Sequence, residues 1–564
     1  MSLFAAVQQS ANALRISELG LQVTGNNIAN ANTPGYVRQD MVQATGVGVR
    51  IGEAIVGYGA RVVGVVQKID DYVVQRMRDA NSKLAYNEQL SQANSQLETS
   101  IAELGDNDLS SLMSRFANAF HDLANQPGNT SLKTLVIERG KELAMGLKTV
   151  AQAAVDIQQR SIADIRSVGT EINRLTERIA VLNTRIVEME GGGASNSDAV
   201  GLRDERLKLL DELSGLVDFR ATEQESGSVT VSVGGDYLVA DGIPRKVTAH
   251  LNSEEGKVEI RLADTDAPLE VTGGKLKGHY EARDGVAGHF LEQMDTLASD
   301  IIQVVNKVHS QGQGSIGFKD VLGDFAVENE FAALEQSGLE APVDNGSFVV
   351  TVADARTGLK NTYDIQIRQQ GLGTDTTTVD LIQQLDNIPG IRASLTNEGK
   401  VRITSDSEAI QFSFSNDTSG VLSALGINTF FKGNSASTME VRPELGTQPN
   451  LLALSLDGVG QGAGNALKLA SAFEDVQEML GGRSLRQNYE AAIVDVTQNV
   501  STQEGITEGI RNYYQTLEAQ HLGTSGVSLD EEAVKMLQYQ RAFQATSKLI
   551  ATANEMLETL VTML

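Results

Sequence analysis

The stretch from Ser528 to Leu564, SLDEEAVKMLQYQRAFQATSKLIATANEMLETLVTML, predicts a long amphipathic helix. Ser528 followed three residues later by Glu531 is a capping box, and the flanking acids suit the positive end of a helix. Large apolar residues then recur every seven positions at Leu529, Met536, Phe543, Ile550, Leu557 and Leu564, with Tyr539, Ala553 and Leu560 in a second row. Such a heptad seam needs a partner, so we expect another segment or another chain to cover it.

The N-terminal segment predicts a second amphipathic helix, which can pair with the first. Its apolar stripe consists of Leu3, Val7, Leu14, Leu21 and Ile28, with Phe4 beside it. The helix should end before Thr33-Pro34-Gly35, because proline disfavours helix in the preceding residue and Pro-Gly suits a type II turn. So thin a stripe buries too little surface for a stable isolated helix. We hypothesise that both terminal segments are disordered in the monomer and fold on assembly, which protease-resistant termini in dilute monomer would contradict.

Asparagines crowd the end of this first helix, and they allow two interpretations. They can simply end the helix, or their side chains can bond backbone groups of neighbouring chains in a crowded assembly. The sequence leaves both open. We therefore add one further set to the apolar residues of the two seams as candidate subunit-interface residues: Asn27, Asn32, Thr33, Pro34, Gly35 and Tyr36.

Further helices are expected between the ends of the chain. Two heptad rows over residues 165–189 predict a coiled-coil seam that stops at Gly191-Gly192-Gly193. Residues 112–123 and 202–217 predict shorter amphipathic helices. Within the second of these, Arg203-Asp204-Glu205-Arg206 is interpreted as a salt-bridged solvent face.

The centre of the chain has the period of strands. Val229, Val231 and Val233 alternate, Gly234-Gly235 turns, and Tyr237 begins the return, which predicts a hairpin. Similar alternation recurs near residues 258–262, 363–367 and 412–414, and the helical period resumes from Ala466. The sequence thus predicts an α+β multidomain protein: a coiled-coil-like α-helical stalk built from both termini, with an inserted β-rich region.

We divide the chain into four expected domains. Residues 1–60 with 525–564 form a terminal helical domain, and residues 61–218 with 447–524 form a helical stalk. Residues 219–325 and 326–446 form two β-rich domains. The predicted helix 283–310 either packs in the first β-rich domain or docks along the stalk.

Composition excludes several classes of function. The net charge of −27 repels phosphate backbones and anionic membranes, so no nucleic-acid or membrane partner is expected. There are no cysteines, which excludes disulfides and thiolate sites, and no apolar run approaches a membrane span. The start of the chain lacks the basic region of a secretory signal peptide.

No pattern of a catalytic, cofactor or metal site stands out. The six histidines show no metal-ligand spacing, and there is no nucleophile elbow or Walker A motif. Gly458-x-Gly460-x-x-Ala463 loosely matches a dinucleotide fingerprint, but it lies between helices, so a flexible turn explains it better. We expect no enzyme activity, no cofactor and no metal.

Several motifs resemble one known family. Ala31-Asn32-Thr33-Pro34-Gly35-Tyr36 is similar to the turn after the first helix in bacterial flagellar rod, hook and hook-associated proteins. Within that superfamily, four further segments resemble the hook-associated protein 1 family: residues 202–213, Thr429-Phe430-Phe431-Lys432-Gly433, residues 526–532 and residues 539–545. The hook protein typically has Asn-Val-Asp-Leu where this chain has Gly-Val-Ser-Leu.

The resemblance implies a structural protein at the hook–filament junction, outside the cell on the flagellum. Such proteins assemble as a homo-oligomeric ring, with the terminal helices forming the innermost tube and β domains projecting outward. Implied partners are the flagellar hook protein, a second junction protein on the filament side, and a cytosolic export chaperone that holds the C-terminal helix. The chain would be cytoplasmic only transiently, before type III export.

Other functions remain open at this stage. A hook-protein-like subunit would elongate without limit when purified. A stalked surface adhesin or carbohydrate-binding protein would bind glycans through residues 219–446. An enzyme such as a hydrolase with a hidden glutamate pair has no motif in its support.

Overall fold

The computed structural model describes residues 3–46, 49–51, 54–57, 59–102, 108–190, 199–252, 256–456, 458 and 462–563. By contacts between residues, the chain divides into two compact units. The first consists of Met1–Gln92, Gln159–Arg283 and Ser501–Leu564, and the second of Ala93–Gln158 and Asp284–Val500. The four-domain division remains a prediction.

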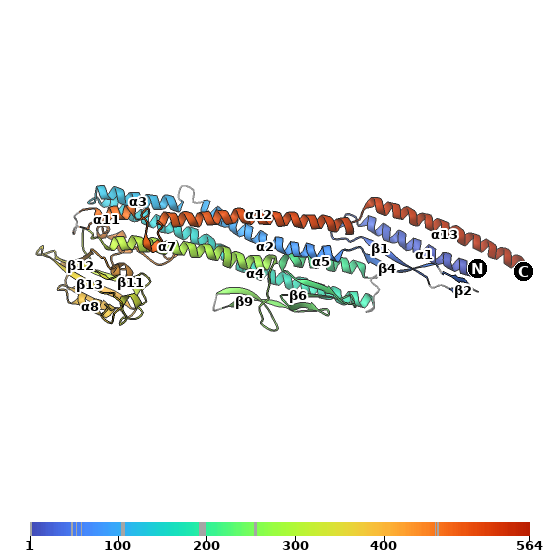
Figure 1. Cartoon of the computed structure of the whole chain (residues 1–564), viewed down its shortest axis with the longest axis horizontal. Helices are drawn as coiled ribbons and strands as arrows, with labels where there is room; N and C mark the ends of the chain where they lie inside the picture. The colour runs from blue at the N-terminus through green and yellow to red at the C-terminus, as the bar shows by residue number, and fades with distance from the viewer. Residues whose placement is uncertain are drawn as a thin grey trace. The chain divides into compact units, whose positions relative to one another are not determined.

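Helices dominate the described chain (Figure 1). The α-helices are α1 Leu3–Ala29, α2 Asp71–Ala102, α3 Leu109–Asn125, α4 Thr130–Met189, α5 Val200–Leu216, α6 Gly274–Glu281, α7 Gly288–Ser310, α8 Thr378–Asp386, α9 Val421–Ala424, α10 Pro443–Thr447, α11 Gly464–Ser471, α12 Leu485–Ser525 and α13 Leu529–Met563. A π-helical segment, Ala282–Ala287, leads directly into α7. The predicted helices at 112–123 and 202–217 are present as α3 and α5.

The strands form small antiparallel sheets rather than one large one. They are β1 Gln39–Thr45, β2 Val49–Ile51, β3 Ala54–Val56, β4 Ala60–Gln67, β5 Arg220–Glu223, β6 Val229–Val233, β7 Asp236–Ala240, β8 Ile243–Pro244, β9 Val247–Asn252, β10 Lys257–Leu262, β11 Asp320–Ala326, β12 Gly346–Asp354, β13 Lys360–Ile367, β14 Ile391–Leu395, β15 Lys400–Ser405, β16 Ile410–Ser415, β17 Phe431–Lys432 and β18 Glu440–Val441. The predicted hairpin is the β6–β7 pair.

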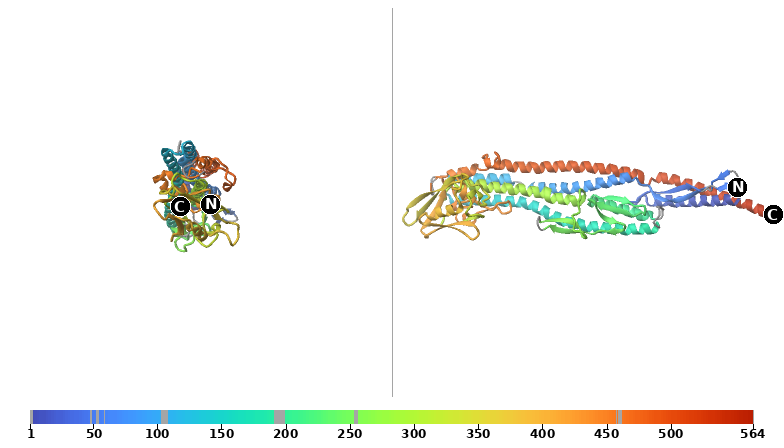
Figure 2. Two further views of the ribbon diagram at one scale, coloured as in Figure 1. Left: turned by 90° about the vertical axis from the view of Figure 1, so that its left-hand side faces the viewer. Right: turned by 60° about the horizontal axis from the view of Figure 1, so that its bottom comes forward.

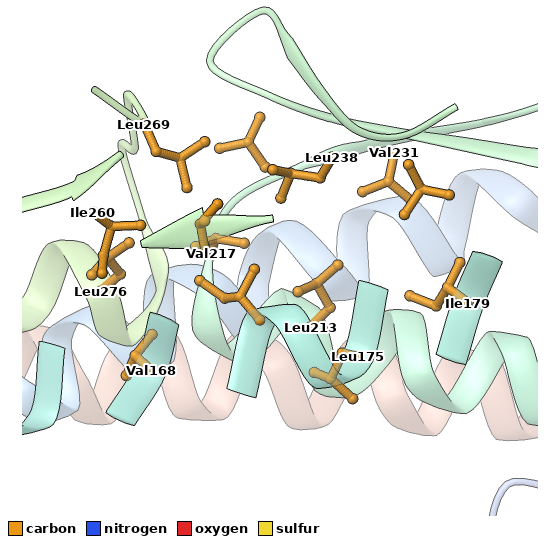
Figure 3. Packing of buried hydrophobic residues seen from close by; sticks show 14 of the residues in the cluster. Val168, Leu175, Ile179, Leu213, Val217, Val231, Leu238, Ile260, Leu269 and Leu276 are labelled. Carbon is orange, nitrogen blue, oxygen red and sulfur yellow. The ribbon is translucent and has the colours of Figure 1, made fainter. Parts of the chain in front are cut away.

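The core of the first unit shows that the predicted coiled-coil seam over residues 165–189 is wrong. The two rows lie on α4 and are buried from Ile165 to Ile186, but they face α5 and the strands of residues 220–262 rather than a second long helix. Figure 3 shows Leu175 and Ile179 of α4 pointing toward Leu213 and Val231. The apolar rows therefore form a helix-on-sheet core, because the inward-facing valines of β6 offer the flat surface that covers them.

The charged run of α5 is also not the solvent face that the sequence suggested. Arg203 and Arg206 are buried. Arg203 donates to both carboxylate oxygens of Glu190, at 3.0 and 2.9 Å, and to Glu223 at 2.6 Å. Arg206 donates to Asn183 Oδ1 at 2.9 Å, and burial lowers its pKa to about 10. The partners lie outside the helix, so helical spacing could not reveal them.

The second unit holds two three-stranded sheets, with orders β11–β15–β14 and β13–β12–β16, around one apolar core. A separate cluster of aromatic rings joins α3 to β17, with Phe116 lying 5.1 to 5.7 Å from its ring neighbours. Helix α7 packs against α9, α11 and β17 of this unit. Asn306 of α7 accepts from the backbone N–H groups of Phe430 and Phe431, which explains why the Thr-Phe-Phe segment is fixed there.

The Phe116→Ala variant should lower the free energy of unfolding of the second unit by about 3–5 kcal/mol, because it leaves a cavity among closely packed rings. Chemical denaturation followed by circular dichroism measures this. Phe331→Ala is the matched control, since that ring is 73% exposed, and it should change stability by less than about 0.5 kcal/mol. Equal losses in both variants would contradict the assignment of Phe116 to the core.

Candidate functional site

The two terminal helices lie side by side. Figures 1 and 2 show α1 and α13 running antiparallel, with both chain termini at the same end of the pair. The most deeply buried face of α1 is lined by small and polar residues together with one valine: Ser17, Gly20, Val23, Thr24 and Asn27. At Gly20 the backbone approaches the Tyr539 ring so closely that an added Cβ would lie 2.6 Å from it.

The predicted apolar stripes of the two helices are more exposed to solvent than this face of small and polar residues. Val7, Leu14, Leu21 and Ile28 are half-buried. On α13, the half-buried positions are Met536, Tyr539, Phe543, Ile550 and Leu557. Leu529 is exposed. Leu3, Phe4 and Leu560 belong to the helices, but their side chains lie outside the described residues, as does all of Leu564. The stripes are thus brought together, with part of each still open to solvent.

The turn after α1 returns the chain to the helix pair. Asn32, Thr33, Pro34 and Gly35 are exposed there, and Gly35 adopts a positive φ of 79°, as a type II turn requires. The turn brings Tyr36 back to the end of α1, where its hydroxyl donates to Asn27 Oδ1 at 2.8 Å.

Asn27 is fully buried and acts as a junction of hydrogen bonds within its own chain. Its Oδ1 accepts from the Gln39 backbone N–H at 3.0 Å, and its Nδ2 donates to the Gln39 carbonyl at 2.8 Å. The same Nδ2 also donates to Glu532 Oε2 at 2.9 Å. Asn27 therefore bonds α1, β1 and α13 at once, and the helix-ending interpretation alone does not account for it.

Arg38 completes the contact between the ends of the chain. Its guanidinium lies 2.8 Å from Glu532, whose side chain is 0% exposed, and 2.7 Å from Glu531, whose side chain is 62% exposed. The Arg38 backbone N–H donates to the carbonyl of Ser525, the last residue of α12, at 2.9 Å. We call Asn27, Tyr36, Arg38, Glu531 and Glu532 the terminal clasp.

The electrostatics of the clasp keep its groups in their bonding forms. Burial, with the nearby charges of Asp204 and Glu532, raises the pKa of Tyr36 to about 12, so its hydroxyl remains a donor. Burial lowers the pKa of Arg38, but the hydrogen bond to Glu531 and the charges of both glutamates outweigh this and leave it raised. The hydrogen bond from Arg38 lowers the pKa of Glu531.

Asp204 of α5 lies against the same region. It accepts hydrogen bonds from the Gln67 side chain and the Val37 backbone, yet burial outweighs both and raises its pKa to about 6. At neutral pH the ionised Asp204 carboxylate therefore lowers the stability of the fold, because its burial removes it from water.

Sequence reasoning missed the central members of the clasp. Arg38 and Glu532 are 494 residues apart, so no periodicity connects them. The sequence pattern marks Glu532 only as one of the acids that flank the capping box, near the positive end of the C-terminal helix. One sequence feature could have indicated the ion pair: an arginine follows the N-terminal turn, and a group of acidic residues begins the C-terminal helix.

The described chain offers little for other chemistry. No cluster of three or more His, Asp or Glu side chains able to hold a metal ion occurs among the described residues. None of the helices in the described ranges combines the length and apolar character needed to cross a bilayer. The glycine-rich segment 458–463 lies partly outside these ranges.

Three family models match the chain. The flagella basal body rod protein model matches residues 7–36, and the C-terminal model of flagellar basal body rod FlgEFG proteins matches residues 518–563. The model of the flagellar hook-associated protein FlgK helical domain matches residues 94–321. The terminal matches cover most of α1, its turn and α13, and they contain every member of the clasp except Arg38.

Curated relatives are similar over much of the chain. Flagellar hook-associated protein 1 of Escherichia coli (strain K12) is 23% identical, covering 98% of this chain and 99% of the relative. The protein of the same name from Bacillus subtilis (strain 168) is 26% identical over 57% of this chain and 70% of the relative. A solved structure, the flagellar hook junction protein FlgK from Burkholderia pseudomallei, aligns with a TM-score of 0.49 and 15% identity, covering 79% of this chain and 99% of that one.

The helix pair and the models that match it define an axial protein of the bacterial flagellum. Within this class, the match to the FlgK helical-domain model and the relative that spans nearly the whole chain both indicate hook-associated proteins. By these comparisons, the chain is similar to the flagellar hook-associated protein 1 family.

The Gly20→Ala variant should weaken the pairing of α1 with α13 by about 1–3 kcal/mol, because the new methyl group overlaps the Tyr539 ring. Counting filament-bearing cells by electron microscopy measures the consequence for assembly. Gly25→Ala is the control on the same helix, since nothing lies within 4 Å of its added Cβ. If both variants assembled equally well, the close approach at Gly20 would not matter.

Asp204→Asn should stabilise the first unit at pH 7 by about 1–2 kcal/mol, after allowance for solvent screening of a partly exposed group. The folded pKa of about 6 lies above the ordinary 3.8, so the carboxyl destabilises the fold above pH 6. This cost fades as pH falls from 6 toward 3.8. Urea unfolding from pH 4 to 7 should show a flatter profile in the variant, and an equally steep profile in both proteins would contradict the raised pKa of Asp204.

Proposed function

We propose that the chain is a structural subunit at the hook–filament junction, assembling with further copies of itself as a ring that connects hook to filament. The observation that carries this proposal is the terminal helix pair. The clasp joins its two helices by hydrogen bonds and ion pairs, and large apolar side chains of α13 remain exposed. The names of the relatives support the same position in the flagellum.

The apolar surface left on α13 is too extensive for a helix meant to remain in water. Its exposed large side chains are Leu529, Val534, Leu537, Leu549, Met556 and Val561. Exposed apolar surface concentrated on one element is typical of an interaction site. The half-buried stripe of α1 adds to it. Neighbouring copies would cover both, which is how a ring of identical subunits completes each member.

Several partners follow from the same surface. On the flagellum, the ring would contact the hook protein on one side and a second junction protein on the other. Before export, an apolar α13 needs protection in the cytoplasm, which a chaperone bound to residues 529–563 would supply. We further propose that terminal pairing becomes stable only when neighbours contribute, because the apolar stripes are half-buried in a single chain.

The alternatives have less support. An unlimited hook-like polymer and a glycan-binding adhesin each predict a behaviour of the purified chain, elongation or glycan binding, that tests them directly. We propose that the chain works by contact alone and catalyses no reaction.

Leu549→Glu should abolish filament attachment while the hook still forms, because it places a charge on exposed apolar surface that neighbouring copies would bury. Electron microscopy of cells that carry only the variant measures attachment. Deletion of residues 529–564 defines complete loss. Gln544→Glu adds the same charge at another exposed position of α13 and should retain attachment. Normal filaments on Leu549→Glu cells would refute the role of this face.

A further inference from the structure

A surface cluster of two tyrosines and one arginine lies on the first unit and shares no residue with the clasp. Tyr72 and Arg76 are one turn apart near the start of α2, and Tyr513 belongs to α12. The Arg76 guanidinium carbon lies 5.5 Å from the centre of the Tyr72 ring and 5.7 Å from that of Tyr513. Its Nη2 donates to the Tyr513 hydroxyl at 2.6 Å. The three side chains form an aromatic–cation–aromatic stack.

The stack rests on a fixed base. Beneath it, Met77 and Ala80 of α2 and Leu517 of α12 form a small buried core. About three turns further along, the Gln503 side chain donates to Asn87 Oδ1 at 2.9 Å, and other polar contacts join the same two helices. The two helices therefore hold the stack in place, so that little conformational freedom is lost when something binds to it.

The stack is open to solvent. Tyr72 is 68% exposed and Tyr513 is 44% exposed. Ile506 is also exposed. It lies seven residues, about two helical turns, before Tyr513 on α12, so it extends the patch along that helix. Exposed tyrosine and arginine side chains on a rigid support are the residue types that dominate binding energy at protein interfaces.

The charge of Arg76 is unusual for its surroundings. Within the part of the chain that the structure describes, its partners are the two phenol groups, and no carboxylate pairs with it. Neighbouring arginines are neutralised: Arg78 pairs with Asp211 at 2.7 Å and Arg511 with Glu88 at 2.9 Å. In a chain of net charge −27, an arginine held between rings without an acidic partner still has a positive charge that a carboxylate can bind.

We propose that the patch of Tyr72, Arg76, Ile506 and Tyr513 docks an acidic helical segment of a second copy of this chain. The inference rests on the proposed function, since a ring brings unlike faces of identical subunits together. Charge complementarity selects the occupant. A chain with 73 acidic residues against 46 basic ones presents many carboxylates to its neighbours, and each contact needs a cation that is not already paired.

The test uses the full chain in living cells. A photo-reactive phenylalanine derivative replaces Tyr72, flagella are irradiated and purified, and cross-linked peptides are identified by mass spectrometry. We expect a product with the mass of two chains, joined from position 72 to a peptide of the second copy that contains Asp or Glu. Mixing isotope-labelled and unlabelled copies separates links between chains from links within one chain.

A second arm tests the charge. Arg76→Glu should reduce the yield of the two-chain product and filament attachment about tenfold or more. Arg166→Glu is the control, because it makes the same charge reversal at an exposed arginine of α4. Equal circular dichroism spectra of both purified variants show that folding is intact.

The outcomes separate the two proposals. If the chain is present in purified flagella but position 72 links only to another axial protein or to nothing, the docking inference is wrong and the proposed function stands. Equal attachment in both arginine variants also overturns it. If the chain is absent from flagella altogether, the proposed function itself fails.

Discussion

The buried ion pair between Arg38 and Glu532 is the constraint on which the terminal structure depends. A carboxylate with 0% exposure is tolerated only when its charge is matched and its oxygens are bonded, and Arg38 with Asn27 supplies both. Removing Arg38 would take away the close counter-charge of the buried Glu532 carboxylate, whereas Arg38 also pairs with Glu531. α1, β1, α12 and α13 each supply a group that bonds Asn27 or Arg38, so a shift of any of these elements along its axis would break at least one of these bonds.

Close packing of small residues adds to this constraint. Gly20 lets the Tyr539 ring lie directly on the α1 backbone, and Ser17 and Thr24 continue the same narrow face. The larger apolar residues are displaced to the flanks, where they remain half-buried. This arrangement suits a protein that assembles with other copies. The face of small residues on α1 packs against α13 of the same chain, and the apolar flanks are left for contact with other chains.

Periodicity predicted the helices well and their partners poorly. The rows of α4 were expected to form a coiled coil, but valines of β6 and leucines of α5 cover them, since any sufficiently apolar surface satisfies such a row. Arg203 and Arg206 follow a pattern typical of a solvated helix, yet both are buried. Their partners lie outside α5: Glu190 and Glu223 for Arg203, and Asn183 for Arg206. The N-terminal turn and the two terminal helices were predictable, because proline, glycine and heptad spacing act locally. Arg38 and Glu532 were not, because a long-range ion pair leaves no local pattern.

The sequence separation of 494 residues between Arg38 and Glu532 has a consequence for how the molecule matures. Arg38 is synthesised early, just before β1, and its counter-charge Glu532 is synthesised only with the last helix, α13. A chain that stops short of Glu532, through premature termination or proteolysis, retains an unmatched guanidinium at that position. Only a polypeptide made almost to completion can therefore form the Arg38–Glu532 pair when its terminal helices come together.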